Sequence, residues 1–219
     1  MLVERSMHPG WLSNAYLVAD EEGGTAVFVD SGAPMEPLSE AAERWRVKPQ
    51  HVLRTHGDPD HVAHEAELGL TVVTRSLDAG GLHVEALPTP GHSSDHLAFV
   101  VNGDTCFSGD ILFKDAVGGG PDATAIRHSV MDVLMQLPPE TRVFPGHTDE
   151  TTIGREWEEN PFVRYWRDLD PAVDEPCTFG GEDATVVVWS PDYDGKGKVL
   201  IRFGDGREAI VGGSRIVRT

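Results

Sequence analysis

A stretch rich in histidine and aspartate, RTHGDPDHVAHEAELG, spans residues 54–69. It places His56, Asp58, Asp60 and His61 within six positions. Imidazole and carboxylate groups are the ligands expected for zinc, iron or manganese. The same residues also describe a helix start, because Asp58 is a good N-cap, Pro59 suits the first helical position and Asp60 favours the positive helix end. The stretch alone leaves both interpretations open.

Three further motifs add candidate ligands, and each lies at a glycine turn that follows an expected strand. They are PTPGH with His92, FSGD with Asp110 and FPGH with His147. Glycine at a strand end lets side chains from distant segments converge without crowding from the backbone. A single histidine is more often a packed or surface residue, but three equivalent placements beside the first stretch favour a shared metal site.

Other polar residues near these motifs have simpler interpretations. We expect His96 to hold the turn that carries His92, and we expect His64 and His128 to be packed or solvated on helices. Asp30, in VDSG, is expected to form a turn. No serine near the motifs has an evident histidine and carboxylate pairing, so a serine nucleophile is not supported.

The elements that must position these side chains are short strands and amphipathic helices. Apolar, β-branched runs predict strands at residues 14–19, 25–30, 51–55, 71–74, 83–87, 97–101, 104–109 and 142–147. Apolar side chains recur with helical spacing between residues 123 and 137, which predicts an amphipathic helix. Helices are also expected at residues 35–47 and 151–166, where Pro161 marks a break.

The composition changes after about Asp170, where DLDPAVDEP is acidic and contains prolines, as a connector would. The runs ATVVVW, KVLIRF and REAIVG follow, separated by turns with Asp-Gly pairs, which is typical of a β-meander. We therefore divide the chain into a metal-binding domain, residues 1–173, and a small C-terminal β module, residues 174–219. We expect the module to be an appendage that the first domain can lose.

The composition also restricts the partners. The chain has 219 residues and a formal net charge of −18, which opposes binding to nucleic acid or to anionic membranes. It shows no signal-peptide pattern and no apolar run near the ~20 residues of a membrane helix, so we expect a cytoplasmic protein. Its two cysteines, Cys106 and Cys177, form no C-x-x-C pair and fit a reducing compartment.

Taken in order, T-H-x-D-x-D-H, P-G-H, S-G-D and P-G-H resemble the motifs of the metallo-β-lactamase superfamily. The segments NAYLV, VDSG, TPGHSSDH, SGDILF and PGHTDETTIGREWEENPF are similar to its glyoxalase II-like branch, over roughly residues 10–165. The resemblance implies an α/β fold, a four-layer αββα sandwich with its site at one edge of two sheets. The C-terminal module resembles small SH3-like barrels.

The resemblance further implies a centre of two divalent metal ions. One metal would take His56, the residue at position 58, and His92, the other would take Asp60, His61 and His147, and Asp110 would bridge them. Most of the family has histidine where this chain has Asp58, although the similar flavodiiron proteins place a carboxylate there and hold iron. A more anionic site shifts the metal preference from zinc toward iron or manganese. Alternatively, the first position is weak and one ion is bound.

Two other departures concern the surroundings of the site. Residues 71–87 form a shorter connection to PTPGH than relatives usually carry, so we expect a less covered site. Glyoxalase II ends in helices that help to hold glutathione, whereas this chain ends in a β module, so specificity for glutathione is not implied. The module is expected to serve packing or homo-oligomerisation, with peptide recognition as the alternative.

The expected function is hydrolysis of a thioester, or of a related ester or lactone, in a small-molecule or carrier-bound substrate. Bound metals would lower the pKa of a water toward ~7 and polarise the carbonyl, and Asp60 is expected to orient the nucleophile. The alternative is an oxidoreductase similar to persulfide dioxygenases, with one iron held by His56, His92 and Asp110. A third class is a non-catalytic binding protein with a degraded site, for which Asp58 is the only argument.

Overall fold

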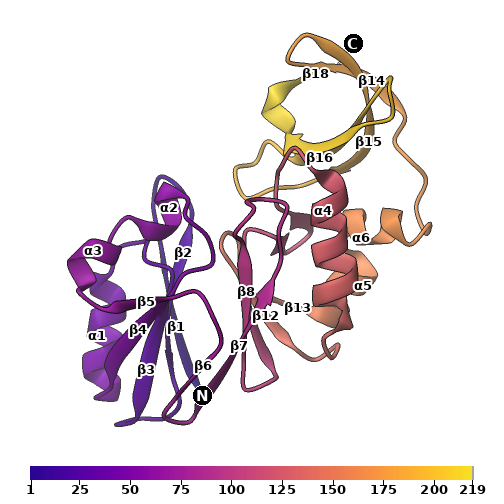
Figure 1. Ribbon diagram of the computed structural model, residues 1–219. Coiled ribbons are helices and arrows are strands. Elements are labelled where there is room, and N and C mark those ends of the chain that lie inside the picture. The colour runs from indigo at the N-terminus through magenta and orange to yellow at the C-terminus, as the bar shows by residue number, and fades with distance from the viewer. Residues whose placement is uncertain (219) are drawn as a thin grey trace.

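The computed structural model describes residues 1–218 and shows two β-sheets that face each other between layers of helices (Figure 1). The first sheet has the order β1-β2-β3-β4-β5, with strands Leu2–Met7, Asn14–Ala19, Thr25–Val29, Lys48–Leu53 and Thr71–Val73. The second has the order β13-β12-β9-β8-β7-β6. Its strands are β6 Leu77–Ala79, β7 Leu82–Pro88, β8 Leu97–Val101, β9 Thr105–Gly109, β12 Arg142–Pro145 and β13 Thr151–Thr152.

Strand β2 shows why the sheets are layered. All six of its residues are buried, and successive side chains point to opposite faces of the sheet. Ala15 and Leu17 pack in the cluster that contains helix α1 (Glu36–Trp45), on the outer face. Tyr16 and Val18 pack in the cluster that contains Phe107 of the second sheet. One strand therefore joins the outer helical layer to the core between the sheets.

The outer face of the second sheet is covered by helices α4 (Ala123–His128), α5 (Ile153–Glu159) and α6 (Pro161–Trp166). The chain continues from α4 through a π-helical turn, Ser129–Val133, and a 3₁₀ turn, Leu134–Gln136. Its stripe of Ile126, Val130 and Leu134 is fully buried. Asn160 separates α5 from α6 and caps the latter, which agrees with the break predicted at Pro161. The four-layer sandwich is therefore confirmed.

The sequence misses some details of the sandwich. Strand β1 was not expected, and a small hairpin, β10 Leu112–Phe113 and β11 Ala116–Val117, follows the SGD motif. The helix expected after the TH motif is divided into α2 (Pro59–Val62) and α3 (Glu65–Leu68), and it ends at Gly69 in the left-handed conformation. Within residues 1–218, no helix is long and apolar enough to cross a membrane.

The C-terminal module is a five-stranded antiparallel sheet of order β17-β16-β15-β14-β18. Its strands are β14 Glu175–Phe179, β15 Glu182–Ser190, β16 Lys198–Phe203, β17 Glu208–Gly212 and β18 Ile216–Arg218. The sheet curls so that β18 returns to β14 (Figure 1). Strands β17 and β18 form its two edges, so the structure shows a curved open sheet, and the small SH3-like barrel that the resemblance implies is not confirmed.

The module shares a hydrophobic core with the sandwich. Val187, Leu200 and Ile210 are buried in the cluster that also contains Ile126 and Trp166 of the outer helices. A second cluster, which includes Val186, Val199 and Ile201, lies inside the module itself. Strands β15 and β16 are therefore apolar on both faces. This packing argues against the expectation that the sandwich can lose the module freely.

Candidate metal centre

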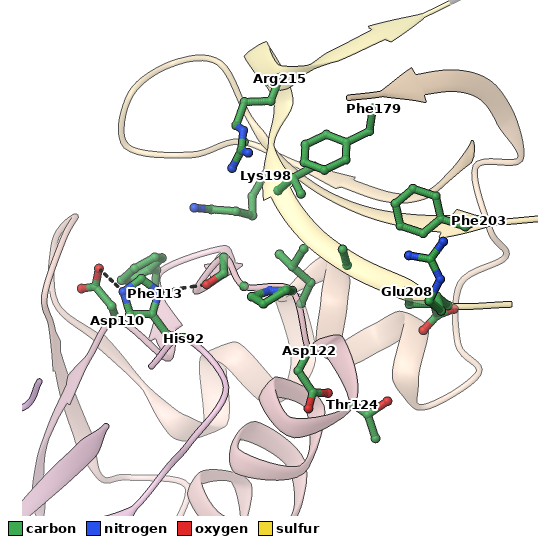
Figure 2. Close-up of a pocket in the computed structure, with 18 of the residues that line it drawn as sticks. His92, Asp110, Phe113, Asp122, Thr124, Phe179, Lys198, Phe203, Glu208 and Arg215 are labelled. Carbon is green, nitrogen blue, oxygen red and sulfur yellow. Dashed lines mark hydrogen bonds and ion pairs between the residues drawn. The ribbon is translucent and has the colours of Figure 1, made fainter. Parts of the chain in front are cut away.

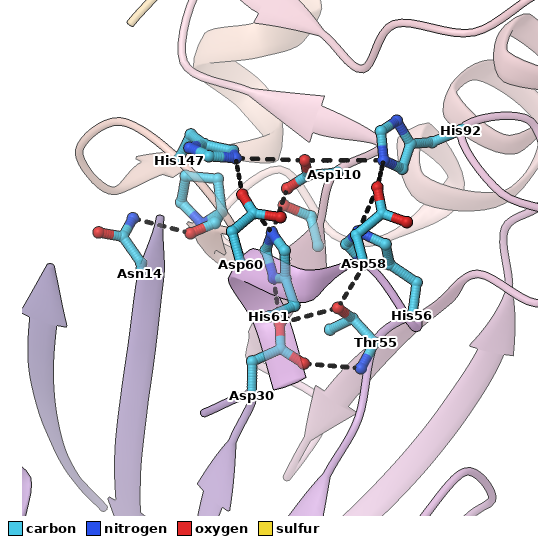
Figure 3. Close-up of polar contacts among 12 residues, drawn as sticks. Asn14, Asp30, Thr55, His56, Asp58, Asp60, His61, His92, Asp110 and His147 are labelled. Carbon is cyan, nitrogen blue, oxygen red and sulfur yellow. Dashed lines mark hydrogen bonds and ion pairs between the residues drawn. The ribbon is translucent and has the colours of Figure 1, made fainter. Parts of the chain in front are cut away.

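The seven predicted ligands lie together at one edge of the two sheets (Figure 3). Four come from the segment between β4 and the end of α2, and the others follow β7, β9 and β12. Three groups have ligand atoms within 4.8 Å of one another: His56 with Asp58 and His92, His56 with His61 and Asp110, and Asp60 with His61 and His147. The seven side chains span 91 positions of the sequence, from His56 to His147, and the fold brings them into one cluster.

Asp110 is the central side chain of this cluster. Its Oδ1 lies 3.3 Å from Nε2 of His61, and its Oδ2 lies 3.3 Å from Nε2 of His147 and 3.8 Å from Nε2 of His92. Ligands that share a tetrahedral zinc at 2.0–2.1 Å lie about 3.3 Å from one another. The two oxygens of Asp110 thus face histidines of both halves of the cluster, as a bridging carboxylate would.

The carboxylates of Asp58 and Asp60 face opposite halves of the cluster. Asp58 Oδ2 lies 3.2 Å from Nε2 of His92 and 3.8 Å from Nε2 of His56. Asp60 Oδ2 lies 3.5 Å from Nε2 of His147. Asp58 occupies the N-cap position of α2, but its side chain makes no capping hydrogen bond. The Asp58 carboxylate is turned toward His92 and His56, so helix capping does not explain its orientation.

All four histidines of the cluster are oriented by hydrogen bonds at the ring nitrogen that faces away from it. Nδ1 of His56 lies 2.9 Å from Thr55 Oγ1, and Nδ1 of His61 lies 2.8 Å from Asp30 Oδ2. Nδ1 of His92 lies 2.8 Å from the Gly119 carbonyl, and Nδ1 of His147 lies 3.0 Å from the Leu12 carbonyl. Carbonyl and carboxylate oxygens accept from Nδ1–H, which leaves the Nε2 lone pair for a metal. Each ring is thus fixed with Nε2 toward the centre.

Unpartnered atoms at the centre also fit a metal ion. Nε2 of His56, Nε2 of His61 and Oδ1 of Asp110 are buried and have no hydrogen-bond partner. A buried polar group without a partner costs about 1–3 kcal/mol. Converging nitrogen and oxygen donors of this kind match the ligands of zinc, iron and manganese. A bound cation would satisfy all three atoms.

The charges of the cluster are strongly coupled. Burial alone would raise the pKa of Asp110, but the adjacent His61 and His147 hold it well below its usual range. Burial alone would lower the pKa of His61, but Asp110 and Asp30 outweigh burial and raise it well above its usual range. Burial lowers the pKa of His56, which favours the neutral ring that can bind a metal.

Asp30 has a role that the sequence did not predict. It lies at the end of β3 with φ of 55°, as a turn residue would, but its side chain is buried. Oδ1 accepts from the backbone N–H of Thr55 at 2.8 Å, and Oδ2 accepts from the Thr55 hydroxyl and from Nδ1 of His61. Its description as only a turn former is therefore incomplete, because this carboxylate orients a candidate ligand.

Two residues of the NAYLV motif hold the loop that carries His147. The Asn14 amide donates to the carbonyls of Pro145 and Thr148, and the Tyr16 hydroxyl donates to the Pro145 carbonyl at 2.7 Å. Gly146 is required in this loop, because a Cβ there would lie 2.1 Å from Oδ1 of Asp110. The signal available in the sequence was only that polar residues interrupt a buried strand.

Three histidines that the sequence assigns to other roles, His64, His96 and His128, lie outside the ligand cluster. His96 is buried, and its Nε2 accepts from the backbone N–H of Asp110 at 2.9 Å while its Nδ1 faces the Thr89 hydroxyl. Burial and the nearby His56 keep its pKa well below the usual range, which favours the neutral ring. His64 and His128 pair with acidic neighbours on their own helical segments.

The C-terminal module contributes an aromatic residue for which the sequence carries no local signal. The Tyr193 ring, from the β15–β16 loop, stacks on His147 with ring centres 4.0 Å apart and planes within 6°. Its hydroxyl makes no hydrogen bond within the described chain. The preceding Asp192 is joined to Lys198 by an ion pair of 3.0 Å, with both side chains almost fully buried. The module thus fixes an aromatic wall beside the cluster.

A pocket of about 960 Å³ lies between the ligand cluster and the module. His92, Asp110 and Phe113 line its inner end, and Lys198 and Arg215 reach into it from the module (Figure 2). The short 71–87 connection led us to expect a less covered site. In the structure, residues of the C-terminal module line the pocket beside the ligand cluster, so the module covers the site.

Comparison with curated proteins finds relatives along most of the chain. An uncharacterized protein of Aquifex aeolicus is 30% identical over 194 residues, which covers 68% of this chain and 91% of that protein. A hydroxyacylglutathione hydrolase-like protein of Mus musculus is 37% identical over 160 residues, which covers 60% of this chain and 56% of the mouse protein. No family model matches the chain.

Solved structures show the same fold. TTHA1623, solved in a di-iron-bound form, is 33% identical with a TM-score of 0.61, covering 72% of this chain and 98% of that one. ETHE1 from Myxococcus xanthus is 27% identical with a TM-score of 0.64, covering 74% of this chain and 84% of that one. The B3 metallo-β-lactamase BLEG-1, 24% identical with a TM-score of 0.67, shares the fold, covering 74% of this chain and 99% of that one.

Proposed function

Because the chain belongs to the metallo-β-lactamase superfamily and to its glyoxalase II-like branch, we propose that it is a metal-dependent hydrolase that cleaves thioesters. The observation that carries the proposal is the convergence of four Nε2 atoms on the two oxygens of Asp110 and on two further carboxylates. Related esters and lactones are further candidate substrates, because one kind of site on this fold can cleave several kinds of bond.

The ligand set that we propose has two halves. His56, Asp58 and His92 would hold one divalent ion, Asp60, His61 and His147 would hold the other, and Asp110 would bridge them. Bound metal ions of this kind lower the pKa of a water toward ~7 and polarise a carbonyl. The three aspartates make the site anionic, which favours iron or manganese over zinc. The di-iron form of TTHA1623 supports this preference.

The thiol and the serine hydroxyl of strand β9, which leads to Asp110, are both withheld from the cluster. Cys106 is fully buried, and burial raises the pKa of its thiol to about 12. The Ser108 hydroxyl is buried and donates to the Leu112 carbonyl. Neither group is available to attack a substrate, so water is the nucleophile that this site favours.

We assign the remaining steps to Asp60 of the ligand cluster and to Tyr193, which lines the pocket. Asp60 is one-quarter exposed, so its carboxylate can orient the attacking water and accept its proton. The water oxygen forms the new C–O bond, the C–S bond breaks, and the products are a carboxylate and a thiol. A thiolate leaves without strong acid assistance, and the Tyr193 hydroxyl is free to donate a hydrogen bond to the substrate.

A second candidate function is an oxidoreductase similar to persulfide dioxygenases. His56, His92 and Asp110 form the pattern of two histidines and one carboxylate that suits a single iron. The likeness to ETHE1 gives this candidate weight. The second half of the cluster, formed by Asp60, His61 and His147, favours the hydrolase. A single iron held by His56, His92 and Asp110 would leave these three candidate ligands without a metal.

The test is a direct comparison of the two reactions with one protein preparation. Acyl thioesters are supplied with the protein loaded with zinc, manganese or iron, and released thiol is measured with a thiol-reactive dye. Oxygen uptake is measured in parallel with a persulfide substrate. We expect thiol release without oxygen uptake, whereas persulfide-dependent oxygen uptake without thiol release would select the second candidate.

Asp110→Ala and Asp132→Ala form a matched pair for this test. Asp110 faces three histidines, so its loss should remove metal and thioesterase activity together. Asp132 is an exposed aspartate paired with His128 on the surface, so its loss should change neither. Full thioesterase activity in Asp110→Ala would rule out the proposed centre.

A further inference from the structure

The pocket beside the ligand cluster has a larger volume than a short acyl group needs. Its volume of about 960 Å³ lies at the upper end of the roughly 300–1,000 Å³ typical of small-molecule sites. The inner end touches His92 and Asp110, and the outer end runs along the module to Phe179 and Phe203. A short acyl group would fill only the inner part. The outer part therefore suits the second half of a long substrate.

The outer end of the pocket pairs aromatic rings with guanidinium groups. The guanidinium of Arg215 lies 4.9 Å from the centre of the Phe179 ring, and that of Arg207 lies 4.6 Å from the centre of the Phe203 ring. Stacking on a ring orients the planar guanidinium while leaving the N–H donors at its edge free. Such an edge matches the two oxygens of a phosphate or carboxylate.

Arg215 is the cation of this pocket that lacks a carboxylate partner. Arg207 is paired with Asp205 at 2.6 Å and with Glu182 at 2.7 Å, and Lys198 is paired with Asp192. Arg215 forms no ion pair within the part of the chain that the structure describes. Its side chain is exposed and extends from the module toward the pocket (Figure 2).

The acidic residues of the pocket wall are already partnered. Asp122 caps helix α4 by accepting from the backbone N–H of Ala125 at 2.9 Å. Glu208 forms an ion pair of 2.8 Å with Arg202. In a chain with a net charge of −18, an anionic ligand needs a local cation to overcome the general repulsion. Arg215 provides that cation at the outer end.

We propose that Arg215 binds an anionic group, a phosphate or a carboxylate, on the thiol-carrier half of the substrate. This inference rests on the thioesterase function proposed above and specifies its substrate class. The thioester carbonyl lies at the metal cluster, the carrier follows the module, and its anionic group meets the guanidinium on Phe179. The substrates are therefore acyl thioesters of extended, anionic thiols, and the C-terminal module selects them.

Arg215→Gln tests the proposal with three acetyl thioesters. The coenzyme A thioester carries phosphates, the glutathione thioester carries carboxylates, and the N-acetylcysteamine thioester is neutral. For at least one anionic thioester, KM should rise about tenfold, as expected for a lost hydrogen bond to a charged group, while kcat stays within about twofold. The neutral thioester should be unaffected. The anionic substrate that responds identifies phosphate or carboxylate as the bound group.

Arg218→Gln is the matched control. Arg218 is an exposed arginine on the neighbouring strand β18, where it pairs with Glu175 at 3.3 Å and does not line this pocket. It should leave all three KM values unchanged. Equal KM changes in both variants, or the same effect of Arg215→Gln on neutral and anionic thioesters, would overturn the subsite.

A binding measurement separates the subsite from the reaction. S-methyl-coenzyme A and S-methylglutathione have no scissile thioester, and calorimetry reports their binding to the metal-loaded protein directly. Binding that weakens about tenfold in Arg215→Gln supports the subsite even if no thioester is hydrolysed, in which case only the proposed function fails. Thioester hydrolysis combined with equal binding to wild type and Arg215→Gln would overturn the subsite and leave the hydrolase intact.

Discussion

Asp58 is the residue at which a helix cap and a metal ligand make different predictions. Its carboxylate makes no capping bond and faces His92 and His56. Asp58→Asn should therefore change the unfolding free energy of the metal-free protein by no more than a few tenths of a kcal/mol. It should weaken metal binding in that half of the cluster, because the shape remains but the charge is lost.

Asp58→His extends this prediction. It restores the pattern common in the family and should shift preference from iron or manganese toward zinc, since an imidazole replaces a hard oxygen ligand. The measurement is metal content after purification under equal supply of the three metals. Identical metal content in wild type and both variants would show that Asp58 is not a ligand.

Asp30 allows a test of ligand orientation without removing a ligand. Asn tolerates the left-handed backbone of this position, so Asp30→Asn keeps the fold but removes the charge beside Nδ1 of His61. Metal affinity should fall about 10–100-fold in competition with a chelator. Asp78→Asn, which changes an exposed histidine–aspartate pair with His83, is the control. Equal affinities in the two variants would contradict the role of Asp30.

The sequence could indicate that the seven candidate ligands lie together, because few roles suit histidine and aspartate repeatedly placed at glycine turns. The role of Asp30 could not be predicted in the same way. Its partner His61 lies 31 positions later, and the two meet only because β3 and β4 are parallel neighbours. A carboxylate at a strand end reads as a turn former until that register is known.

At the scale of elements, the β15–β16 loop brings Tyr193 to the metal cluster. Tyr193→Phe keeps the stack on His147 and removes only the hydroxyl, so metal content should be unchanged. We expect kcat/KM for a thioester to fall about tenfold or more, as for loss of a hydrogen-bond donor to the reacting group.

Tyr165→Phe is the control for this prediction. Tyr165 lies on α6, and its hydroxyl accepts a hydrogen bond from Arg202 at 2.9 Å. Tyr165 does not line the pocket. Its variant should retain the wild-type rate. If the two variants hydrolyse the thioester equally fast, the Tyr193 hydroxyl does not act on the substrate.

The module as a whole should be needed for folding. Removing it after Asp174 exposes the apolar face that packs on Val187, Leu200 and Ile210, and each such side chain contributes about 1.5–3 kcal/mol when buried. We expect the shortened chain to be insoluble or to unfold at a lower temperature. A soluble product with the melting temperature of the full chain would contradict the shared core.

The sequence predicts the strands of the module but not its position. ATVVVW is apolar at consecutive positions, which fits a strand buried on both faces, yet the pattern does not say what covers each face. A register shift between Val186 and Val188 directs Val186 into the module and its neighbours toward the sandwich. The contact with the metal cluster follows from that packing and has no local signal.

At the scale of the whole molecule, the sandwich brings distant carboxylates and imidazoles together at one sheet edge. Without a cation, the folded protein must keep buried donor and acceptor atoms unsatisfied at His56, His61 and Asp110. The sandwich itself was predictable from ordered motifs, and its layers follow from strands such as β2 that are buried on both faces. The proposed binuclear centre therefore requires two bound ions per chain.

The measurement that tests this most directly is a metal titration of the metal-free protein, with thioester hydrolysis recorded at each step. Activity should be absent without metal, rise as zinc, manganese or anaerobically supplied iron is added, and saturate at two ions per chain. Hydrolysis that persists in the presence of a chelator, or activity that is complete at one ion per chain, would contradict the binuclear centre.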